Sequence, residues 1–165
     1  MVTLAPIKQS PLQLDAWTEF AWLNLPVDIT SRYHLDLLGA GVWDYKAAIR
    51  ALSLLTTGNA DMQQVNSHFY DYDIWTNLHF GYVGSAAGFT ADQLLQGAGV
   101  AQMLSDEYHT GLITQHPPAI GFASYDNPHD QAAINVGISL WWHFALWVQP
   151  SDIVNAIEAA HLYNP

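Results

Sequence analysis

Apolar residues recur every three or four positions along most of the chain, which is the spacing of amphipathic helices. The stretches with this spacing are residues 11–24, 42–55, a short one from 60 that leads into 70–84, and then 90–104, 126–148 and 151–163. No long alternation of polar and apolar residues indicates a larger sheet. We therefore expect an all-α fold, in which residues 1–165 form a compact single domain of about six helices with at most a small β-hairpin.

Capping residues mark several of the expected helix boundaries. Thr90 and Gln93 have the spacing of a capping box, so a helix should begin there. Pro128 stands just inside the start of the most apolar helix, and Ser151 is expected to cap the last one. The connection before the most apolar helix is predicted to be a loop over residues 109–118 and an extended segment over residues 119–125.

The segment from residue 70 to residue 84 mixes carboxylates, aromatic rings, an amide, an imidazole and glycines more densely than any other. On a helical wheel Asp73 and Asn77 share one face with Gly81 and Gly84. The small glycines leave room there, either for a neighbouring helix or for a ligand that approaches the backbone. The pattern alone leaves both interpretations open. Three further polar or aromatic side chains fall on the opposite face: Trp75, His79 and Tyr82.

Charge and composition restrict the possible partners. The net charge is −11 with only four lysine and arginine residues, so the chain offers no basic patch for a nucleic acid, although it would attract a basic protein. It contains no cysteine, which excludes disulfides and thiolate chemistry. The beginning of the sequence lacks the features of a signal peptide, and no apolar run is long enough to span a bilayer, so we expect no stable membrane insertion.

The common catalytic signatures are absent from the sequence. It has no zinc-protease motif, no nucleophile elbow, no phosphate-binding loop and no dinucleotide fingerprint. The spacing of His79, His109, His116 and His129 is not specific for zinc, so scattered surface histidines are the better interpretation. We expect neither a metal nor another cofactor.

Carboxylates among aromatic residues remain as the most promising chemistry. Glycoside hydrolysis requires one carboxyl group held protonated by its surroundings and a second that stays ionised. Asp73 is the candidate proton donor because apolar residues and Asp71 are its sequence neighbours, and Asp44 or Asp130 is the candidate ionised partner. Asp44 and Asp130 could equally cap helix starts. The expected substrate-binding residues are Trp43, Tyr45, Lys46, Tyr72, Trp75, Asn77, His79, Tyr82, Asp126 and Gln131.

Four blocks of sequence together carry a family resemblance. They are Trp43-Asp44-Tyr45-Lys46, Asn77-x-His79-Phe80-Gly81-x-x-Gly84, Leu94-Leu95-x-Gly97-Ala98-Gly99-x-Ala101-Gln102, and Asp126-x-Pro128-x-Asp130-Gln131-Ala132-x-Ile134 with Gly137. In this order they resemble the bacterial polymorphic toxin type 44 domain over roughly residues 33–140, which leaves the helix at 151–163 as an addition. The chain departs from several family members in having Ala40-Gly41 for two glycines and His79 for an asparagine, so an obligatory imidazole at position 79 is not expected.

The resemblance implies an antibacterial toxin module, usually the cargo of a larger secreted carrier or secretion-system protein, with a cognate immunity protein as partner. Such modules have been proposed as nucleases and as cell-wall hydrolases. The acidic, aromatic candidate site favours a lysozyme-like muramidase that cleaves peptidoglycan glycan in the target periplasm or cell wall. Two alternatives stay open: an RNase toxin that acts in the target cytoplasm through His79 or His129, and a non-catalytic acidic helical module that binds a basic protein.

Overall fold

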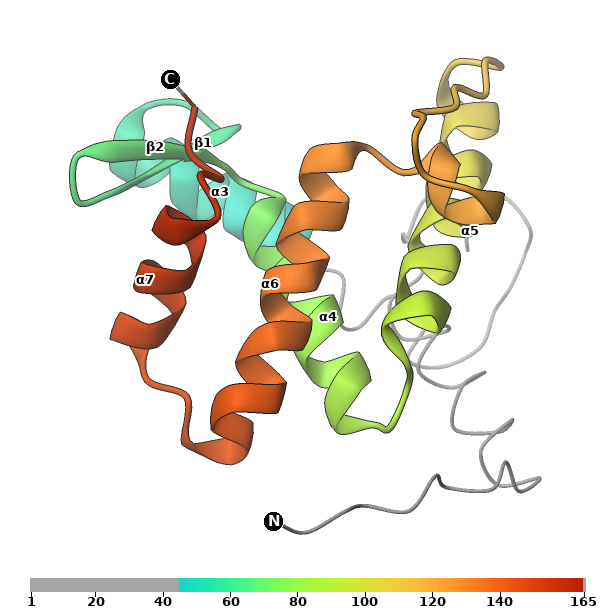
Figure 1. Cartoon of the computed structure of the whole chain (residues 1–165). Coiled ribbons are helices and arrows are strands. Elements are labelled where there is room, and N and C mark those ends of the chain that lie inside the picture. The colour runs from blue at the N-terminus through green and yellow to red at the C-terminus, as the bar shows by residue number, and fades with distance from the viewer. Residues whose placement is uncertain (1–44, 165) are drawn as a thin grey trace, which may run out of the picture.

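The computed structural model describes residues 45–164. The predicted helix at 11–24, Trp43 and Asp44 therefore lie outside the described residues. The described part is mostly α-helical with one small antiparallel hairpin, as expected from the helical spacing (Figure 1). Its elements are α3 (Lys46–Thr57), β1 (Met62–Val65), β2 (His68–Asp71), α4 (Ile74–Ala86), α5 (Ala91–His109), η1 (Gly121–Tyr125), α6 (Pro128–Phe144), η2 (Ala145–Trp147) and α7 (Pro150–Ala159).

Helices α4 and α6 pack closely against each other at the centre of the fold (Figure 1). A Cβ atom added at Gly81 of α4 would meet the backbone carbonyl of Ile134, and one added at Gly137 of α6 would meet the carbonyl of Leu78. The two glycines thus let the helix backbones approach each other. Of the two interpretations of the glycine face of α4, the structure confirms helix packing at Gly81, because α6 occupies the space that a ligand would need.

Two apolar clusters flank this helix pair. The larger cluster joins α4 and α6 to β2, α7 and the residues just after α7, and the smaller one joins them to α5. Burial of these side chains supplies the main stabilising free energy of the fold. The buried members are Tyr70, Ile74, Leu78, Ala133, Val136, Leu140, Ile157 and Leu162 in the first cluster, and Phe89, Leu94, Ile134 and Ile138 in the second.

The segment after residue 60 forms a hairpin, so the short helix predicted there is wrong. β1 pairs with β2 in antiparallel register, from Met62 opposite Asp71 to Val65 opposite His68. Asn66 occupies the turn with a φ of 53°, a left-handed conformation that asparagine tolerates better than most residues. Tyr70 lies on β2, and its side chain is fully buried. The local sequence suits a helix as well as a strand, but burial of this aromatic side chain by distant residues favours the strand.

The predicted start of α5 is confirmed. The hydroxyl of Thr90 accepts a hydrogen bond from the Gln93 backbone N–H (3.2 Å), and the Gln93 side-chain oxygen accepts one from the Thr90 N–H (2.9 Å). These two bonds are the capping box. The start of α6 also follows the sequence, since Asn127 accepts from the His129 N–H (2.9 Å) and Pro128 begins the helix.

Three other boundary predictions are wrong. Residues 121–125 form the 3₁₀ helix η1, because two backbone N–H groups at its start bind the side-chain oxygen of Gln96 (2.7 and 3.2 Å). Helix α6 ends at Phe144, where Ala145 turns the chain with a φ of 46°. Helix α7 starts at Pro150 and is capped by Asp152, which accepts from the Gln149 N–H (2.8 Å), so Ser151 lies inside the first turn.

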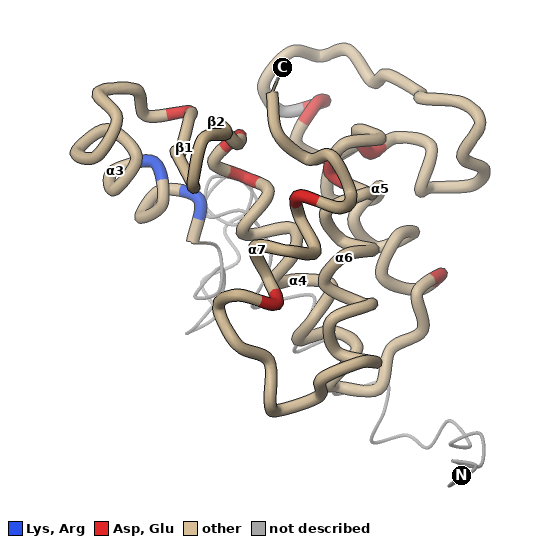
Figure 2. Tube along the Cα trace, turned by 60° about the vertical axis from the view of Figure 1, so that its left-hand side comes forward, with Lys and Arg blue, Asp and Glu red and all other residues tan. Residues whose placement is uncertain are grey.

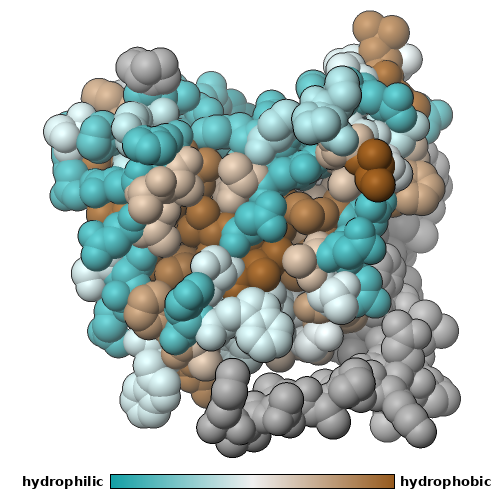
Figure 3. All heavy atoms as spheres, viewed as in Figure 1, coloured by the Kyte–Doolittle hydropathy of each residue, from teal (hydrophilic) through white to brown (hydrophobic). Residues whose placement is uncertain are grey.

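Hydrophobic residues also reach the surface. On the face shown in Figure 3, brown residues occupy the centre between hydrophilic margins. The end of α6 and the η2 turn after it expose large apolar side chains, among them Trp142 (68%), Leu146 (81%) and Trp147 (82%). Among the described residues, no helix combines the length and the apolar character that crossing a bilayer requires.

Candidate active site

Four carboxylates come from neighbouring parts of the fold. Asp71 ends β2, Asp73 is the residue that precedes α4, Asp126 follows η1, and Asp130 lies in the first turn of α6. Lys46, the first residue of α3, is close enough to influence the charges of Asp126 and Asp130. The structure thus brings together charged residues from all three of the polar sequence blocks that include residues 46, 73 and 126–130. We call these four aspartates the carboxylate cluster.

Asp126 is the most deeply buried member of the carboxylate cluster. Its side chain is only 4% exposed, and its Oδ2 atom is buried without a hydrogen-bond partner among the described residues. Burial, followed by the negative charge of Asp130, raises the pKa of Asp126 to about 7, although a hydrogen bond from the Asn127 backbone and the charge of Lys46 oppose the rise. Asp126 is therefore protonated in a large fraction of molecules near neutral pH.

Asp130 is half-buried and remains in contact with solvent. Burial, then the negative charge of Asp73, raises its pKa to about 6, while Lys46 and His129 oppose the rise. The negative charge of Asp130 in turn contributes to the raised pKa of Asp126. Asp126 and Asp130 can therefore hold a proton near neutral pH, and Asp73 and Asp71 supply negative charge beside them.

Two of the four cations in the sequence border the cluster. The positive charge of Lys46 acts on Asp126, Asp130 and Tyr72. Arg50 forms an ion pair with Asp61 (2.8 Å), and its guanidinium lies over the Tyr72 ring, 5.1 Å from the centroid. Burial is the main cause that raises the pKa of the Tyr72 hydroxyl. Figure 2 shows that lysine and arginine in the described trace are confined to α3, on the side that faces the hairpin.

Asn77 and His79 lie on α4, in the turns that follow Asp73. The side-chain nitrogen of Asn77 is buried and has no hydrogen-bond partner among the described residues. The His79 ring packs edge-to-face against Tyr45, with centroids 5.3 Å apart, and burial lowers the pKa of His79. A neutral His79 is thus favoured near neutral pH.

Three of the predicted substrate-binding residues make contacts within the protein. Trp75 packs against the larger apolar cluster beside Tyr70. The Tyr82 hydroxyl donates to the Ala145 carbonyl, and its ring meets Trp141 (5.6 Å between centroids) at the opposite end of α6 from the carboxylate cluster. The amide of Gln131 donates to the Ala123 carbonyl and to that of Asp126 (3.2 Å), which fixes the connection between η1 and α6.

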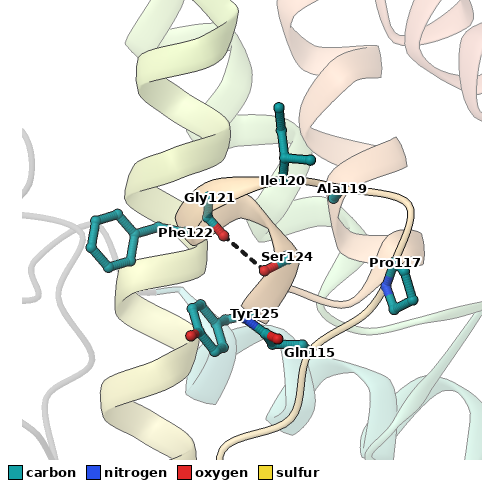
Figure 4. A pocket seen from close by; sticks show the side chains of 8 residues that line it. All are labelled: Gln115, Pro117, Ala119, Ile120, Gly121, Phe122, Ser124 and Tyr125. Carbon is teal, nitrogen blue, oxygen red and sulfur yellow. Dashed lines mark hydrogen bonds between the residues drawn. The ribbon is translucent and has the colours of Figure 1, made fainter.

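A cavity of about 510 Å³ adjoins η1 (Figure 4). Its lining residues are Gln115, Pro117, Ala119, Ile120, Gly121, Phe122, Ser124 and Tyr125. None of the residues predicted for the site belongs to this lining, although Tyr125 directly precedes Asp126. Gly121 allows the turn at the cavity, since its φ is 65°.

The sequence favoured Asp73 as the proton donor, and it gave no sign of the raised pKa values of Asp126 and Asp130. The decisive signal is burial at the start of α6, which the polar Asp126–Asp130 segment does not reveal. The sequence suggested Asp71 only as a neighbour of Asp73, but in the structure its Oδ2 lies 3.9 Å from Nδ1 of His129. No group of three or more histidines, aspartates or glutamates in residues 45–164 has the arrangement of a metal site.

Comparison with known proteins identifies the family. The chain matches the family described as bacterial toxin 44 over residues 39–143, which is more than half of its length. The chain therefore belongs to the bacterial toxin 44 family, as its four sequence blocks had indicated. Comparisons with curated proteins and with solved structures gave no match. The matched region contains the carboxylate cluster and ends before α7.

Proposed function

We propose that this toxin domain hydrolyses the glycan strands of peptidoglycan, as a muramidase, by carboxylate acid/base catalysis. The observation that carries the proposal is the pair of raised carboxyl pKa values, about 6 for Asp130 and about 7 for Asp126, next to the negative charge of Asp73. Glycosidases separate their two carboxyls in the same way, since one must donate a proton while the other is ionised.

Asp130 is assigned the role of proton donor in this proposal. It is half-buried, so it can reach a glycosidic oxygen, whereas Asp126 is only 4% exposed and is too deeply buried to meet a substrate. Asp73, half-buried at the start of α4, is assigned as the ionised partner because its negative charge is the second cause of the raised pKa of Asp130. The sequence suggested the opposite roles, with Asp73 as the proton donor and Asp130 as a candidate ionised partner.

Two neighbouring side chains are assigned to substrate binding. Asn77, one helical turn after Asp73, is assigned to the acetamido groups that peptidoglycan sugars carry, because its side-chain nitrogen has no partner among the described residues. Lys46 limits the negative charge of the cluster and suits the acidic groups of the peptide stems. The domain's net charge of −11 opposes binding to nucleic acid, which weighs against RNA as the substrate.

Membership in the toxin family suggests delivery to a target cell and an immunity protein that protects the producer. The proposed substrate adds that the domain acts in the target periplasm or cell wall. The test is expression of the domain in a bacterium with and without a periplasmic export signal. Lysis only with export supports the muramidase. Killing only without export would support the RNase alternative, and no killing from either compartment would support the binding module. Asp130→Asn should abolish lysis, and the control Glu107→Gln, an exposed residue of α5, should not.

A further inference from the structure

A short segment after α7 reaches back to the carboxylate cluster. The Asn164 backbone N–H donates to the Phe69 carbonyl (2.8 Å), which forms an isolated antiparallel bridge with β2. Leu162 anchors the same segment, since it is only 1% exposed within the larger apolar cluster. Figure 1 shows this segment beside the hairpin, above α7. The backbone bond and the buried leucine hold Asn164 at the edge of the sheet.

The Asn164 side chain continues the connection towards the cluster. Its Nδ2 donates to Oδ1 of Asp71 (2.9 Å), and the other oxygen of Asp71, Oδ2, lies 3.9 Å from Nδ1 of His129. His129 directly precedes Asp130 in the first turn of α6. One carboxylate thus links the segment after α7 to the helix turn that carries the proposed proton donor. Asp71 is 40% exposed, so without Asn164 it has room to turn towards solvent.

We propose that Asn164 is a positioning residue: it holds the Asp71 carboxylate beside His129 and Asp130, so that the segment after α7 completes a site that the family region supplies. The family match ends at residue 143, and this role therefore belongs to a part of the chain outside the match. An effect of Asn164 on catalysis rests on the proposed function. The placement of the negative charge of Asp71 by Asn164 does not depend on it.

The charge of Asp71 acts on Asp130 together with four other groups. Asp73 at the start of α4 and Asp71 at the end of β2 both favour the protonated carboxyl, whereas Lys46 on α3 and His129 on α6 favour the ionised one. Asp126, which follows η1, is the further carboxyl nearby, and its own pKa is raised in part by Asp130. If Asn164 no longer holds Asp71, that carboxylate moves into water, where its charge is screened. The titration midpoint of Asp130 should then fall.

The test is a carboxyl titration by NMR on the full chain with Asn164→Ala, Asp71→Asn and both changes together. We expect Asn164→Ala to lower the Asp130 midpoint by a few tenths of a pH unit, and Asp71→Asn to lower it at least as much. The double variant should match Asp71→Asn alone, because Asn164 acts through Asp71. Because the Asn164 backbone N–H donates to the Phe69 carbonyl, these side-chain changes should leave that bond in place.

Asn66→Gly is the matched control. Asn66 also donates from Nδ2 to a carboxylate, Glu158 (2.9 Å), at the other end of the hairpin, and glycine accepts its positive φ. The control should leave the Asp130 midpoint unchanged. An unchanged or raised midpoint in Asn164→Ala, or a further shift in the double variant, would overturn the inference. Because the titration needs no substrate, it supports or rejects this role even if the domain proves inactive on peptidoglycan.

Discussion

The buried carboxyl of Asp126 should make the stability of the domain fall as the pH rises. Its pKa is about 7 in the folded state against an ordinary value of 3.8, so between these values the folded chain binds more protons than the unfolded one. Stability is then lost with increasing pH through this window. Replacement by asparagine keeps the size of the side chain and removes the charge, so Asp126→Asn should remove this part of the pH dependence.

The magnitude follows from the two pKa values. Between pH 5 and pH 8, a carboxyl that titrates near 7 when folded and near 3.8 when unfolded lowers the free energy of unfolding by about 2–3 kcal/mol. The side chain is only 4% exposed, so solvent screening does not reduce this figure greatly. Between pH 5 and pH 8, the free energy of unfolding should therefore fall by about 2–3 kcal/mol more in the wild type than in Asp126→Asn.

Urea unfolding at pH 5 and at pH 8, followed by circular dichroism, measures this difference. Glu107→Gln on the exposed side of α5 is the control for removal of a carboxylate elsewhere, and it should follow the wild type. If the wild type and Asp126→Asn lose equal stability between the two pH values, the folded protein does not hold a neutral carboxyl at position 126. The explanation of the raised pKa by burial would then be refuted.

Three further changes test separate parts of the structure. Lys46→Met removes the positive charge that opposes protonation of Asp126 and Asp130, so NMR titration should show both midpoints moving to higher pH, and an unchanged pair would contradict the placement of Lys46. Gly81→Ala places a methyl group against the Ile134 carbonyl and should lower the free energy of unfolding by about 1–3 kcal/mol, whereas Ala86→Ser at the exposed end of α4 should change it little; equal effects would argue against the close approach of α4 and α6. Gln96→Ala removes the acceptor for the Phe122 and Ala123 N–H groups, so hydrogen exchange at these two amides should accelerate while exchange within α7 stays unchanged.

Local sequence signals predicted the helices well where one pattern dominated. The Thr90–Gln93 capping box and Asn127-Pro128 gave correct helix starts, because each is satisfied within a single turn. The hairpin and η1 depend on distant partners. Tyr70 becomes a strand residue because the larger apolar cluster buries it, and η1 forms against Gln96, more than twenty residues earlier in the chain. Such partners cannot be read from the segment itself.

The same distinction applies to the candidate site. The sequence identified Lys46, Asp73, Asp126 and Asp130 by residue type and by their place in the blocks, and the structure brings them together. It could not rank the carboxyls, since burial after η1 and at the start of α6 decides which of them holds a proton. Nor could it show that Trp75 packs against the larger apolar cluster or that the Tyr82 hydroxyl donates to the Ala145 carbonyl, because both contacts depend on how α4 packs on distant parts of the chain.

Release of reducing sugar from purified peptidoglycan tests the central proposal most directly. The wild-type domain should generate new reducing ends, and folded Asp130→Asn should lose about 10²–10⁴-fold in rate because the proton donor is gone. Glu107→Gln should retain the wild-type rate. A wild type that releases only new amines, or an Asp130→Asn variant that keeps the wild-type rate, would contradict the assignment of Asp130 as the acid of a muramidase.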